Sequence, residues 1–369
     1  MSESSIHAIL NESFPKSGKE EWIRVASLEL GNQNEIENLI WKIGELKFYP
    51  YYEEKDLQDL SYLKHYQNPR EQGGWENLPM VKVAEESHAN EQALESLTMG
   101  ADGVMFDVVD GIDFNINQLL TEINWSFCRI SFLARPETKI VTKILDYVKQ
   151  NEYASHELRG SIFWTTLPQG DEVKSLILSS LKNLHALGII VQPSSPVEEI
   201  AKALEQGARL MDTLTDLQIE REMIFKNICL SFSAEENFLI NIAKIKAARV
   251  LWYQLSQAFE IPAFLPSDLY IHVVSRKSTS ATFDPHGHMI RNTTDGLSSV
   301  LGNCNALTLC SDDHIKWTSR ISLHVSNILK EESHLDKVID PVAGAYAIES
   351  MVNSLAEAAW KNFQSKMIS

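Results

Sequence analysis

The stretch YIHVVSRKSTSATFDPHGHMIRNTTDGLSSVLGNCNALTLC, Tyr270 to Cys310, decides the fold because it predicts strand, loop, helix and strand in succession. Tyr270 to Val274 is an apolar, β-branched run and predicts a buried strand. Met289 to Leu301 carries apolar residues at helical spacing and is stopped by Gly302. Ala306 to Leu309 predicts the next short strand. Buried strands linked through a helix are the repeating unit of parallel α/β folds.

The same unit recurs eight times from Trp75 onward, which predicts a (β/α)8 TIM barrel. The alternative is a doubly wound sheet, but that fold usually has a glycine-rich first turn, and the turn here is Glu85-Glu86-Ser87-His88. The other six strands are expected at Met80 to Ala84, Gly103 to Val109, Phe127 to Ala134, Gly160 to Thr165, Ile189 to Val191 and Ile228 to Phe232.

The chain divides into an N-terminal extension, residues 1–74, and a barrel, residues 75–369. The extension is expected to be mainly helical, with helices at Glu20 to Leu30 and Asn34 to Ile43. Its aromatic cluster, Phe48 to Tyr52, could pack on the barrel or serve as a subunit-interaction arm. Within the barrel, one helix is expected at Asp171 to Leu187, and the last, Ala347 to Met367, closes the fold.

The composition excludes several classes of protein. The 369 residues have a formal charge of −17, which argues against nucleic-acid binding because phosphate contacts need clustered lysine and arginine. No stretch approaches the roughly 20 apolar residues of a membrane helix, and no secretory signal is evident. The four cysteines form no C-x-x-C pair. We therefore expect a soluble, cytoplasmic protein without a membrane partner.

Chemistry in such a barrel belongs at the C-terminal ends of the strands. Arg276 is the foremost candidate, since a guanidinium there could hold a phosphate or carboxylate bidentately, or equally form a salt bridge at the rim. The other polar groups at predicted strand ends, each of which could also be a solvated rim residue or a helix cap, are Glu85, Glu86, Asp107, Asp110, Arg135, Thr165, Thr166, Gln192, Ser231, Ser233, Ser278, Ser311, Asp312 and Asp313.

The DPHGH motif raises the question of a metal. Asp284, His286 and His288 could ligate zinc, but no third or fourth ligand stands at a fixed spacing, so a solvated loop is preferred. Neither a G-x-S-x-G elbow nor a P-loop occurs. The residues alone therefore predict no complete catalytic constellation.

Five segments resemble the adenosylcobalamin-dependent acyl-CoA mutases, the methylmalonyl-CoA mutase family. VVSRKSTSATFDPHGHMIRNTTDGLSSVLGNCNALTL, Val273 to Leu309, resembles the family's seventh-strand arginine segment, R-x-T-T helix and eighth strand. The other four are similar to an N-terminal small-subunit segment, the fifth and sixth helices, and the closing D-P-x-x-G-x-Y turn: Phe14 to Gly31, Ser195 to Met211, Phe238 to Leu255 and Ser319 to Gln364.

The resemblance implies roles for particular residues. In catalytic members the seventh-strand arginine and a serine two residues on contact the acyl-CoA, and Arg276 and Ser278 stand at those positions. Gly188 to Pro193 lacks the histidine that follows the fifth strand in catalytic members, and the tryptophan–threonine–isoleucine–arginine run and the cobalt-ligating D-x-H-x-x-G loop are not found. The expectation is therefore no catalytic, cofactor-binding or metal-binding residue on this chain, and a weak or vestigial acyl-CoA contact.

The implied function is that of a small (beta) subunit, the structural partner in a heterodimer with a large catalytic subunit. By resemblance, the complex interconverts methylmalonyl-CoA and succinyl-CoA by a radical 1,2-rearrangement, with adenosylcobalamin held by the large subunit. One alternative is an active acyl-CoA barrel that uses a cobalamin domain supplied in trans. Another is a barrel with unrelated, metal-assisted chemistry through His286 and His288.

Overall fold

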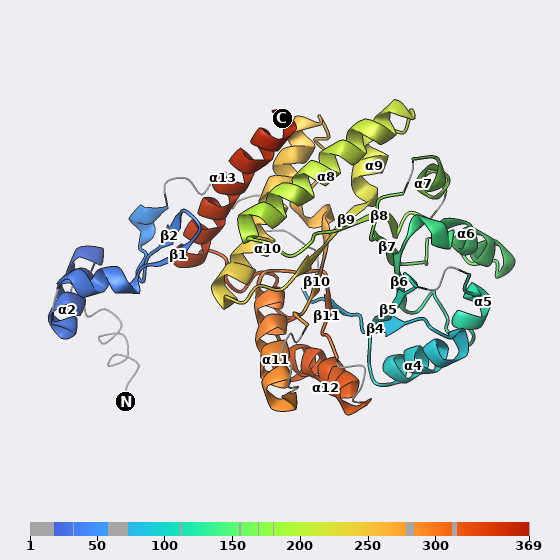
Figure 1. Ribbon diagram of the computed structural model, residues 1–369, viewed down its shortest axis with the longest axis horizontal. Coiled ribbons are helices and arrows are strands. Elements are labelled where there is room, and N and C mark those ends of the chain that lie inside the picture. The colour runs from blue at the N-terminus through green and yellow to red at the C-terminus, as the bar shows by residue number, and fades with distance from the viewer. Residues whose placement is uncertain are drawn as a thin grey trace, which may run out of the picture.

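The fold is described from a computed structural model (Figure 1). It describes residues 18–31, 33–57, 73–110, 113–154, 156–168, 170–179, 181–277, 284–311 and 316–368.

The main sheet is entirely parallel and follows the chain around, as a TIM barrel requires. Its order is β3-β11-β10-β9-β8-β7-β6-β5-β4, so each strand from β4 to β11 lies beside the next one in sequence. The predicted (β/α)8 fold is thereby confirmed. The strands are β3 (Glu76–Asn77), β4 (Met80–Lys82), β5 (Gly103–Asp107), β6 (Arg129–Ala134), β7 (Gly160–Trp164), β8 (Leu184–Ile190), β9 (Ile228–Ser233), β10 (Tyr270–Val274) and β11 (Ala306–Thr308).

The ninth strand arises because the first barrel strand is interrupted at Leu78 and Pro79. Its first part, β3, pairs with β11, and its second part, β4, pairs with β5. Across the interruption, the Leu78 N–H donates to the Leu307 carbonyl at 2.9 Å, and the Met105 N–H donates to the Pro79 carbonyl at 3.0 Å. These bonds join the two ends of the sheet, so eight strand positions surround one axis.

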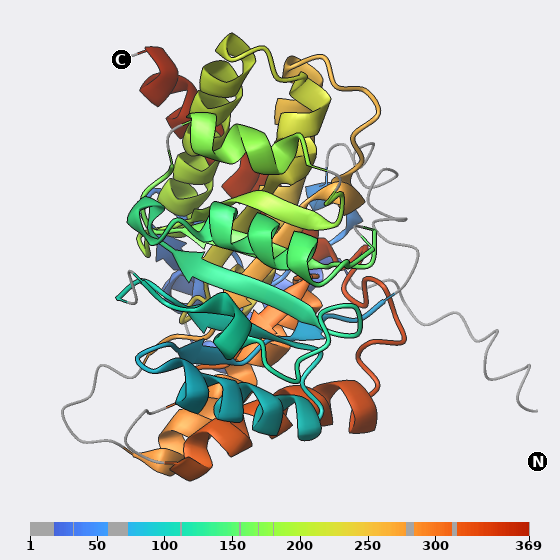
Figure 2. The same ribbon diagram turned by 90° about the vertical axis from the view of Figure 1, so that its right-hand side faces the viewer.

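Helices cover the outside of this sheet (Figures 1 and 2). None of the described helices is long and apolar enough to cross a membrane. They are α4 (Glu86–Thr98), α5 (Ile116–Leu119), α6 (Ile140–Gln150), α7 (Gly170–Ile177), α8 (Pro196–Asp216), α9 (Arg221–Asn227), α10 (Phe238–Ala258), α11 (Pro285–Leu301), α12 (Lys316–Asn327), a π-helical turn (Ile328–Glu332) and α13 (Tyr346–Ile368).

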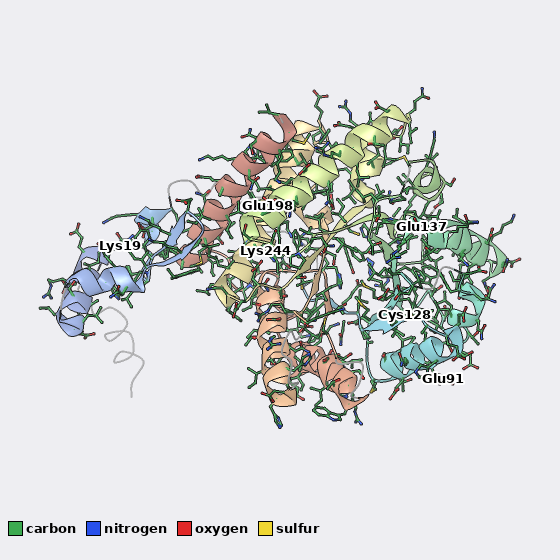
Figure 3. All side chains as sticks on the ribbon, viewed as in Figure 1. Lys19, Glu91, Cys128, Glu137, Glu198 and Lys244 are labelled. Carbon is green, nitrogen blue, oxygen red and sulfur yellow. The ribbon has the colours of Figure 1, made fainter. Side chains whose placement is uncertain are left out.

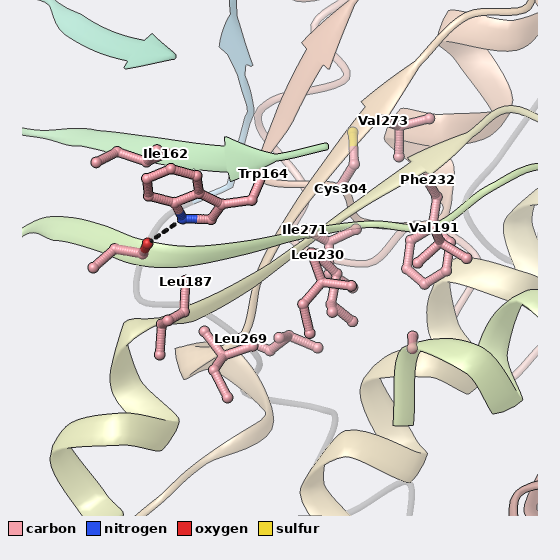
Figure 4. Packing of buried hydrophobic residues seen from close by; sticks show 14 of the residues in the cluster. Ile162, Trp164, Leu187, Val191, Leu230, Phe232, Leu269, Ile271, Val273 and Cys304 are labelled. Atoms are coloured by element: carbon pink, nitrogen blue, oxygen red, sulfur yellow. Dashed lines mark hydrogen bonds between the residues drawn. The ribbon is translucent and has the colours of Figure 1, made fainter. Parts of the chain in front are cut away.

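The larger hydrophobic core lies between the sheet and these helices (Figure 4). Alternate residues of each strand point into it, such as Ile271 and Val273 of β10. Trp164 of β7 closes part of this layer, and its Nε1 donates to the Ala186 carbonyl at 2.8 Å. The residues between them face the barrel axis and form a second, smaller cluster.

The N-terminal arm, residues 18–57, lies beyond α13 from the barrel (Figure 1). It contains α2 (Lys19–Leu30), a 3-10 segment (Gln33–Leu39), a hairpin of β1 (Trp41–Ile43) and β2 (Leu46–Phe48), and a 3-10 turn (Glu54–Asp56). The hairpin and the last turn contact α13, and Phe48 is buried there. Lys19 ties the helix to the turn through a 2.6 Å salt bridge to Asp56.

Two predicted helices were wrong. Asn34 to Ile43 is a 3-10 segment followed by the first hairpin strand, because Gly44 takes the positive φ of 55° that a tight turn favours. The predicted Asp171 to Leu187 helix ends at Ile177, and β8 begins at Leu184. Ile177, Leu181 and Leu184 have helical spacing, but pairing with β7 and β9 draws the end of this run into the sheet.

Candidate functional site

The barrel axis is filled with side chains. Its apolar part consists of Leu78, Met105, Phe163, Cys229, Tyr270 and Ala306, which are 0–7% exposed. Because Phe163 and Tyr270 are large and lie on strands β7 and β10, they occupy the centre from two sides. The interior is thus a packed core, as side-chain layers make it in barrels of this size.

An ion-pair network occupies the N-terminal end of the axis. Arg129 Nε donates to Glu76 Oε2 at 2.7 Å, and the Tyr270 hydroxyl donates to the same oxygen at 2.8 Å. The Arg129 guanidinium also lies 4.1 Å from the centre of the Tyr270 ring. Burial raises the pKa of Tyr270 well above its ordinary value, so its hydroxyl stays a neutral donor to Glu76.

A histidine in the next layer is hydrogen bonded at both ring nitrogens. His272 Nδ1 lies 2.9 Å from Ser231 Oγ, and its Nε2 lies 2.8 Å from Thr308 Oγ1. Thr308 in turn donates to the Leu78 carbonyl at 2.5 Å. Burial, and then the charge of Arg129, lower the pKa of His272 to about 3. The imidazole is therefore neutral at physiological pH and links three strands.

The barrel mouth holds Arg276, just beyond the end of β10. Its guanidinium contacts Asp295 of α11 twice, with Nη2 to Oδ1 at 2.8 Å and Nε to Oδ2 at 3.2 Å. The Arg276 side chain is 28% exposed and that of Asp295 only 2%. The hydrogen bonds that Arg276 donates to Asp295 raise the pKa of the guanidinium, and the charges of Asp295, Glu236 and Glu235 add to this. Its surroundings are thus already acidic.

The remaining strand-end candidates do not converge on one point. Ser278, Asp312 and Asp313 lie outside the described residues. Ser231 faces the axis and bonds to His272, whereas the Ser233 carbonyl accepts from Lys244. Three others have local partners: Glu86 accepts from the Asn115 N–H, Asp107 accepts from the Val109 N–H, and Asp110 pairs with Lys82. The rest lie at the rim in contact with solvent. Those that are exposed are Glu85, Arg135, Thr165, Thr166 and Gln192, and Ser311 is partly exposed.

The DPHGH motif begins a helix, so the expected loop was wrong. Asp284 is the N-cap of α11 and accepts from the His286 N–H at 3.1 Å. His286 is exposed and His288 is buried, so the two rings have different surroundings. Among the described residues there is no group of three histidine, cysteine, aspartate or glutamate side chains that could hold a metal ion. The motif's local role is to start the helix.

Buried lysines explain the long sixth-helix segment. Lys244 of α10, labelled in Figure 3, is fully buried. It donates to Glu199 at 2.6 Å, to Glu235 at 2.7 Å and to the Ser233 carbonyl at 2.7 Å. Burial raises the pKa of Glu199, against the opposite effect of Lys244. The cluster holds α10 against α8 and the end of β9, and each group has found a partner, as buried charges must.

A second buried lysine explains the closing D-P-x-x-G turn. Lys246 Nζ lies 2.7 Å from Asp340 Oδ2 and 3.3 Å from Glu349 Oε1. The Gly344 N–H, in a residue with φ of 77°, also donates to Glu349 at 3.2 Å. Lys246 of α10 therefore binds both Asp340, at the start of the turn, and Glu349, in the first turn of α13. These contacts fix the position at which α13 begins.

Sequence reasoning missed the polar axis of the barrel. The sequence does contain a pattern that indicates this axis, because polar or aromatic residues alternate with apolar ones in two strands. They are Arg129 and Ser131 in β6, and Tyr270 and His272 in β10. Those positions face the axis, whereas nearly all of the candidates named from the sequence lie at or beyond the ends of the strands.

Known proteins resemble this chain along most of its length. A sequence model described as methylmalonyl-CoA mutase matches residues 187–366. The methylmalonyl-CoA mutase small subunit of Porphyromonas gingivalis is 26% identical across 96% of this chain, and that of Streptomyces virginiae is 30% identical across 57%. A dihydropteroate synthase from Coxiella burnetii has a TM-score of 0.39 at 12% identity over 71% of this chain and 95% of its own, which supports no conclusion.

The relatives are longer than this chain. The alignments span 64% of the Porphyromonas protein and 35% of the Streptomyces protein. A third small subunit, from Propionibacterium freudenreichii, is 27% identical across 46% of this chain and 27% of its own length. The barrel, the match of residues 187–366 to the family model and the repeated small-subunit relatives agree with the motifs in the sequence, so this chain is similar to the methylmalonyl-CoA mutase family and, among its members, to three small subunits.

Proposed function

We propose that this barrel is the structural partner of a large mutase subunit that carries the catalytic site, and that the complex interconverts methylmalonyl-CoA and succinyl-CoA. The observation that carries the proposal is the filled barrel axis. Phe163, Tyr270 and Met105 are at most 7% exposed, so an acyl chain could not enter the axis without displacing them. Replacing packed aromatic contacts in this way is energetically unfavourable.

The mouth supports the same reading. Arg276 remains at a position where catalytic relatives contact acyl-CoA, but its guanidinium donates two hydrogen bonds to Asp295. The negative charges of Glu235 and Glu236 also raise the pKa of Arg276. Since coenzyme A is a polyanion, the acidic groups around Arg276 weaken the attraction of this arginine for it. We propose that Arg276, with Ser278, is a vestigial or weak acyl-CoA contact.

The residues of the axis do not fit a cobalamin site. His272 has both nitrogens engaged inside the barrel, and His185 lies further from the mouth on β8. Both rings are therefore held inside the packed barrel, where neither fits the role of a cobalt ligand. When bound, adenosylcobalamin supplies the radical for this class of rearrangement. We assign that cofactor to the large subunit and none to this chain.

The N-terminal arm is the proposed contact with the large subunit. No residue of α2 is buried, and Leu28 is 70% exposed beside Val25 and Leu30. The arm is nevertheless held in shape, because Trp22 stacks on Tyr51 with ring centres 5.5 Å apart. A rigid, apolar surface offered to solvent is typical of an interface. We propose residues 1–74 as the interaction arm and residues 75–369 as the barrel.

Two further expectations accompany this proposal. Porphyromonas gingivalis has both a small-subunit relative and a large subunit that is 27% identical across 44% of this chain, so the two kinds of subunit occur together in one organism. By analogy, this chain would form a heterodimer. Its place would be the cytoplasm, where acyl-CoA substrates are available.

The test is to mix purified chain with its large subunit and follow the complex by size-exclusion chromatography. One shared peak at micromolar concentration is expected, and mutase activity should require the large subunit. Leu28→Asp should weaken the complex, whereas Leu178→Asp, at a leucine just after α7 that is also exposed (55% against 70% for Leu28), should not. Two separate peaks for the unmodified proteins would overturn the proposal.

A calorimetric titration separates this proposal from an active barrel that uses cobalamin in trans. The structural reading expects little or no heat from a CoA ester added to the isolated chain. Tight binding that disappears in Arg276→Ala, with the fold intact, would instead establish the active-barrel alternative.

A further inference from the structure

A second exposed apolar surface lies on the outside of the barrel, over α11 and α12. These helices lie side by side (Figures 1 and 2), and Asn292 Nδ2 of α11 donates to Ser322 Oγ of α12 at 2.9 Å. Each follows a strand of the parallel sheet, so the two run in the same direction. Since two residues along a helix turn the side chain by about 200°, Ile290 and Arg320 point away from this contact at the same height. Both are exposed.

The outer side of α12 extends this surface with apolar residues at helical spacing. Trp317, Ile321 and Ile328 follow one line along the helix, and Trp317 and Ile328 are each nearly half exposed. These two residues lie about 16 Å apart along the helix axis. An apolar row on the solvent side of a surface helix is typical of a contact with another element. We call Ile290, Trp317, Arg320, Ile321 and Ile328 the α11–α12 face.

The charge of this face is opposite to that of the chain as a whole. The chain has a formal charge of −17, yet the sequence of α11 and α12 contains a single carboxylate, Asp295, which is buried against Arg276. Arg320 is exposed on the same two helices, and Arg291 and His324 are partly exposed. The face therefore combines apolar side chains with positive charge. Charge complementarity favours a partner surface that is apolar and acidic.

Helix α2 of the N-terminal arm has such a surface. Glu21, Val25, Leu28 and Glu29 follow one side of this helix, and all four are exposed. That side carries two apolar residues between two carboxylates. Glu21 also pairs with Arg24, but an exposed pair of this kind holds its partners only weakly. Helix α2 is about 18 Å long, close to the length of the apolar row on α12, so it could lie along the α11–α12 face.

The arm of the same chain does not bring α2 to this face. Lys19 is tied to Asp56, Trp22 stacks on Tyr51, and Phe48 is buried, so α2 is held beyond α13 and away from α11 and α12 (Figure 1). We propose that the free chain forms a twofold dimer in which α2 of each copy docks on the α11–α12 face of the other. Two reciprocal contacts close such a dimer, so the association does not continue into a filament.

The dimer rests on the proposed function only in its use of the arm. A large subunit and a second copy compete for α2, so adding the large subunit should convert the homodimer into the heterodimer. The α11–α12 face is used in the homodimer alone. Arg320→Glu should therefore dissociate the homodimer and leave the heterodimer intact, so the two proposals can fail separately.

Sedimentation equilibrium of the full chain tests the dimer without the large subunit. A dimer is expected at about 50 μM, and a chain that stays monomeric there would overturn the proposal. Leu28→Asp on the arm and Trp317→Asp on the face should each raise the Kd of the dimer at least about 10-fold, because each places a charge in an apolar contact. Leu178→Asp, the exposed control outside both surfaces, should leave the Kd unchanged.

Mixing the two variants decides which surfaces meet. A mixed pair keeps the arm of the Trp317→Asp chain and the face of the Leu28→Asp chain, so one of the two contacts is intact and a weaker dimer should reappear. An arm-to-arm dimer would be insensitive to Trp317→Asp, and a face-to-face dimer to Leu28→Asp. Either result, or a mixture that stays monomeric, rejects the exchange. Circular dichroism checks that each variant is folded, and Arg320→Glu replaces Trp317→Asp if that chain is not.

Discussion

Exchanging Arg276 for methionine tests whether this arginine holds the fold or a ligand. The substitution keeps much of the side chain's length and removes two hydrogen bonds to Asp295, of 2.8 and 3.2 Å. It leaves a carboxylate that is only 2% exposed without its cation.

The expected loss of stability follows from these surroundings. Breaking a fully buried ion pair costs about 3–5 kcal/mol. Here the loss should be smaller, because Arg276 is partly exposed and Asp295 keeps the bond from the Arg276 backbone N–H at 3.0 Å. We expect a loss of about 2–3 kcal/mol in the free energy of unfolding. Adding Asp295→Asn should recover part of it, since the buried carboxylate then becomes neutral.

The assay is urea unfolding of the two single variants and the double variant, with CoA-ester titration of each. Arg209→Met is the matched control, because Arg209 pairs with Glu205 on the surface and should lose no more than about 1 kcal/mol. The reasoning fails if Arg276→Met is as stable as this control and Asp295→Asn acts independently of it. A stable Arg276→Met that has lost CoA-ester binding would make the arginine a ligand contact.

Three other predictions follow from the buried charges and the arm. Lys244→Met should lose about 3–5 kcal/mol of stability by urea unfolding, against no more than about 1 kcal/mol for Lys202→Met in a surface pair; equal losses would mean that the buried cluster is not held as described. Because folding lowers the pKa of His272 to about 3, the unfolded chain binds a proton that the folded chain does not. Its stabilising contribution is present above pH 6.5 and falls by up to about 1.4 kcal/mol per pH unit between pH 6.5 and 3, so His272→Asn should flatten the measured pH dependence of stability. Deleting residues 1–40 should abolish co-elution with the large subunit and leave the circular dichroism of the barrel unchanged per residue; retained co-elution would place the interface elsewhere.

The sequence by itself determined the barrel and the family resemblance. Eight apolar runs with helices between them suffice for the fold, since a parallel sheet covered by helices leaves few other arrangements. The motifs from Ser195 onward were also legible as a family pattern because their order and spacing are local properties of the chain. Errors arose where local patterns compete. The Leu176 to Leu184 run fits a helix and a strand equally, and only pairing with neighbouring strands decides between them.

The tertiary structure alone decided what the motifs do. Arg276 and Asp295 are 19 residues apart, and Lys246 and Glu349 more than a hundred, so nothing local shows that they pair. Glu76, Arg129 and Tyr270 meet at the axis only because the sheet closes and brings strands from both ends of the chain together. Closure also determines whether the interior is open or filled, since that depends on how the inward side chains of eight strands share one volume.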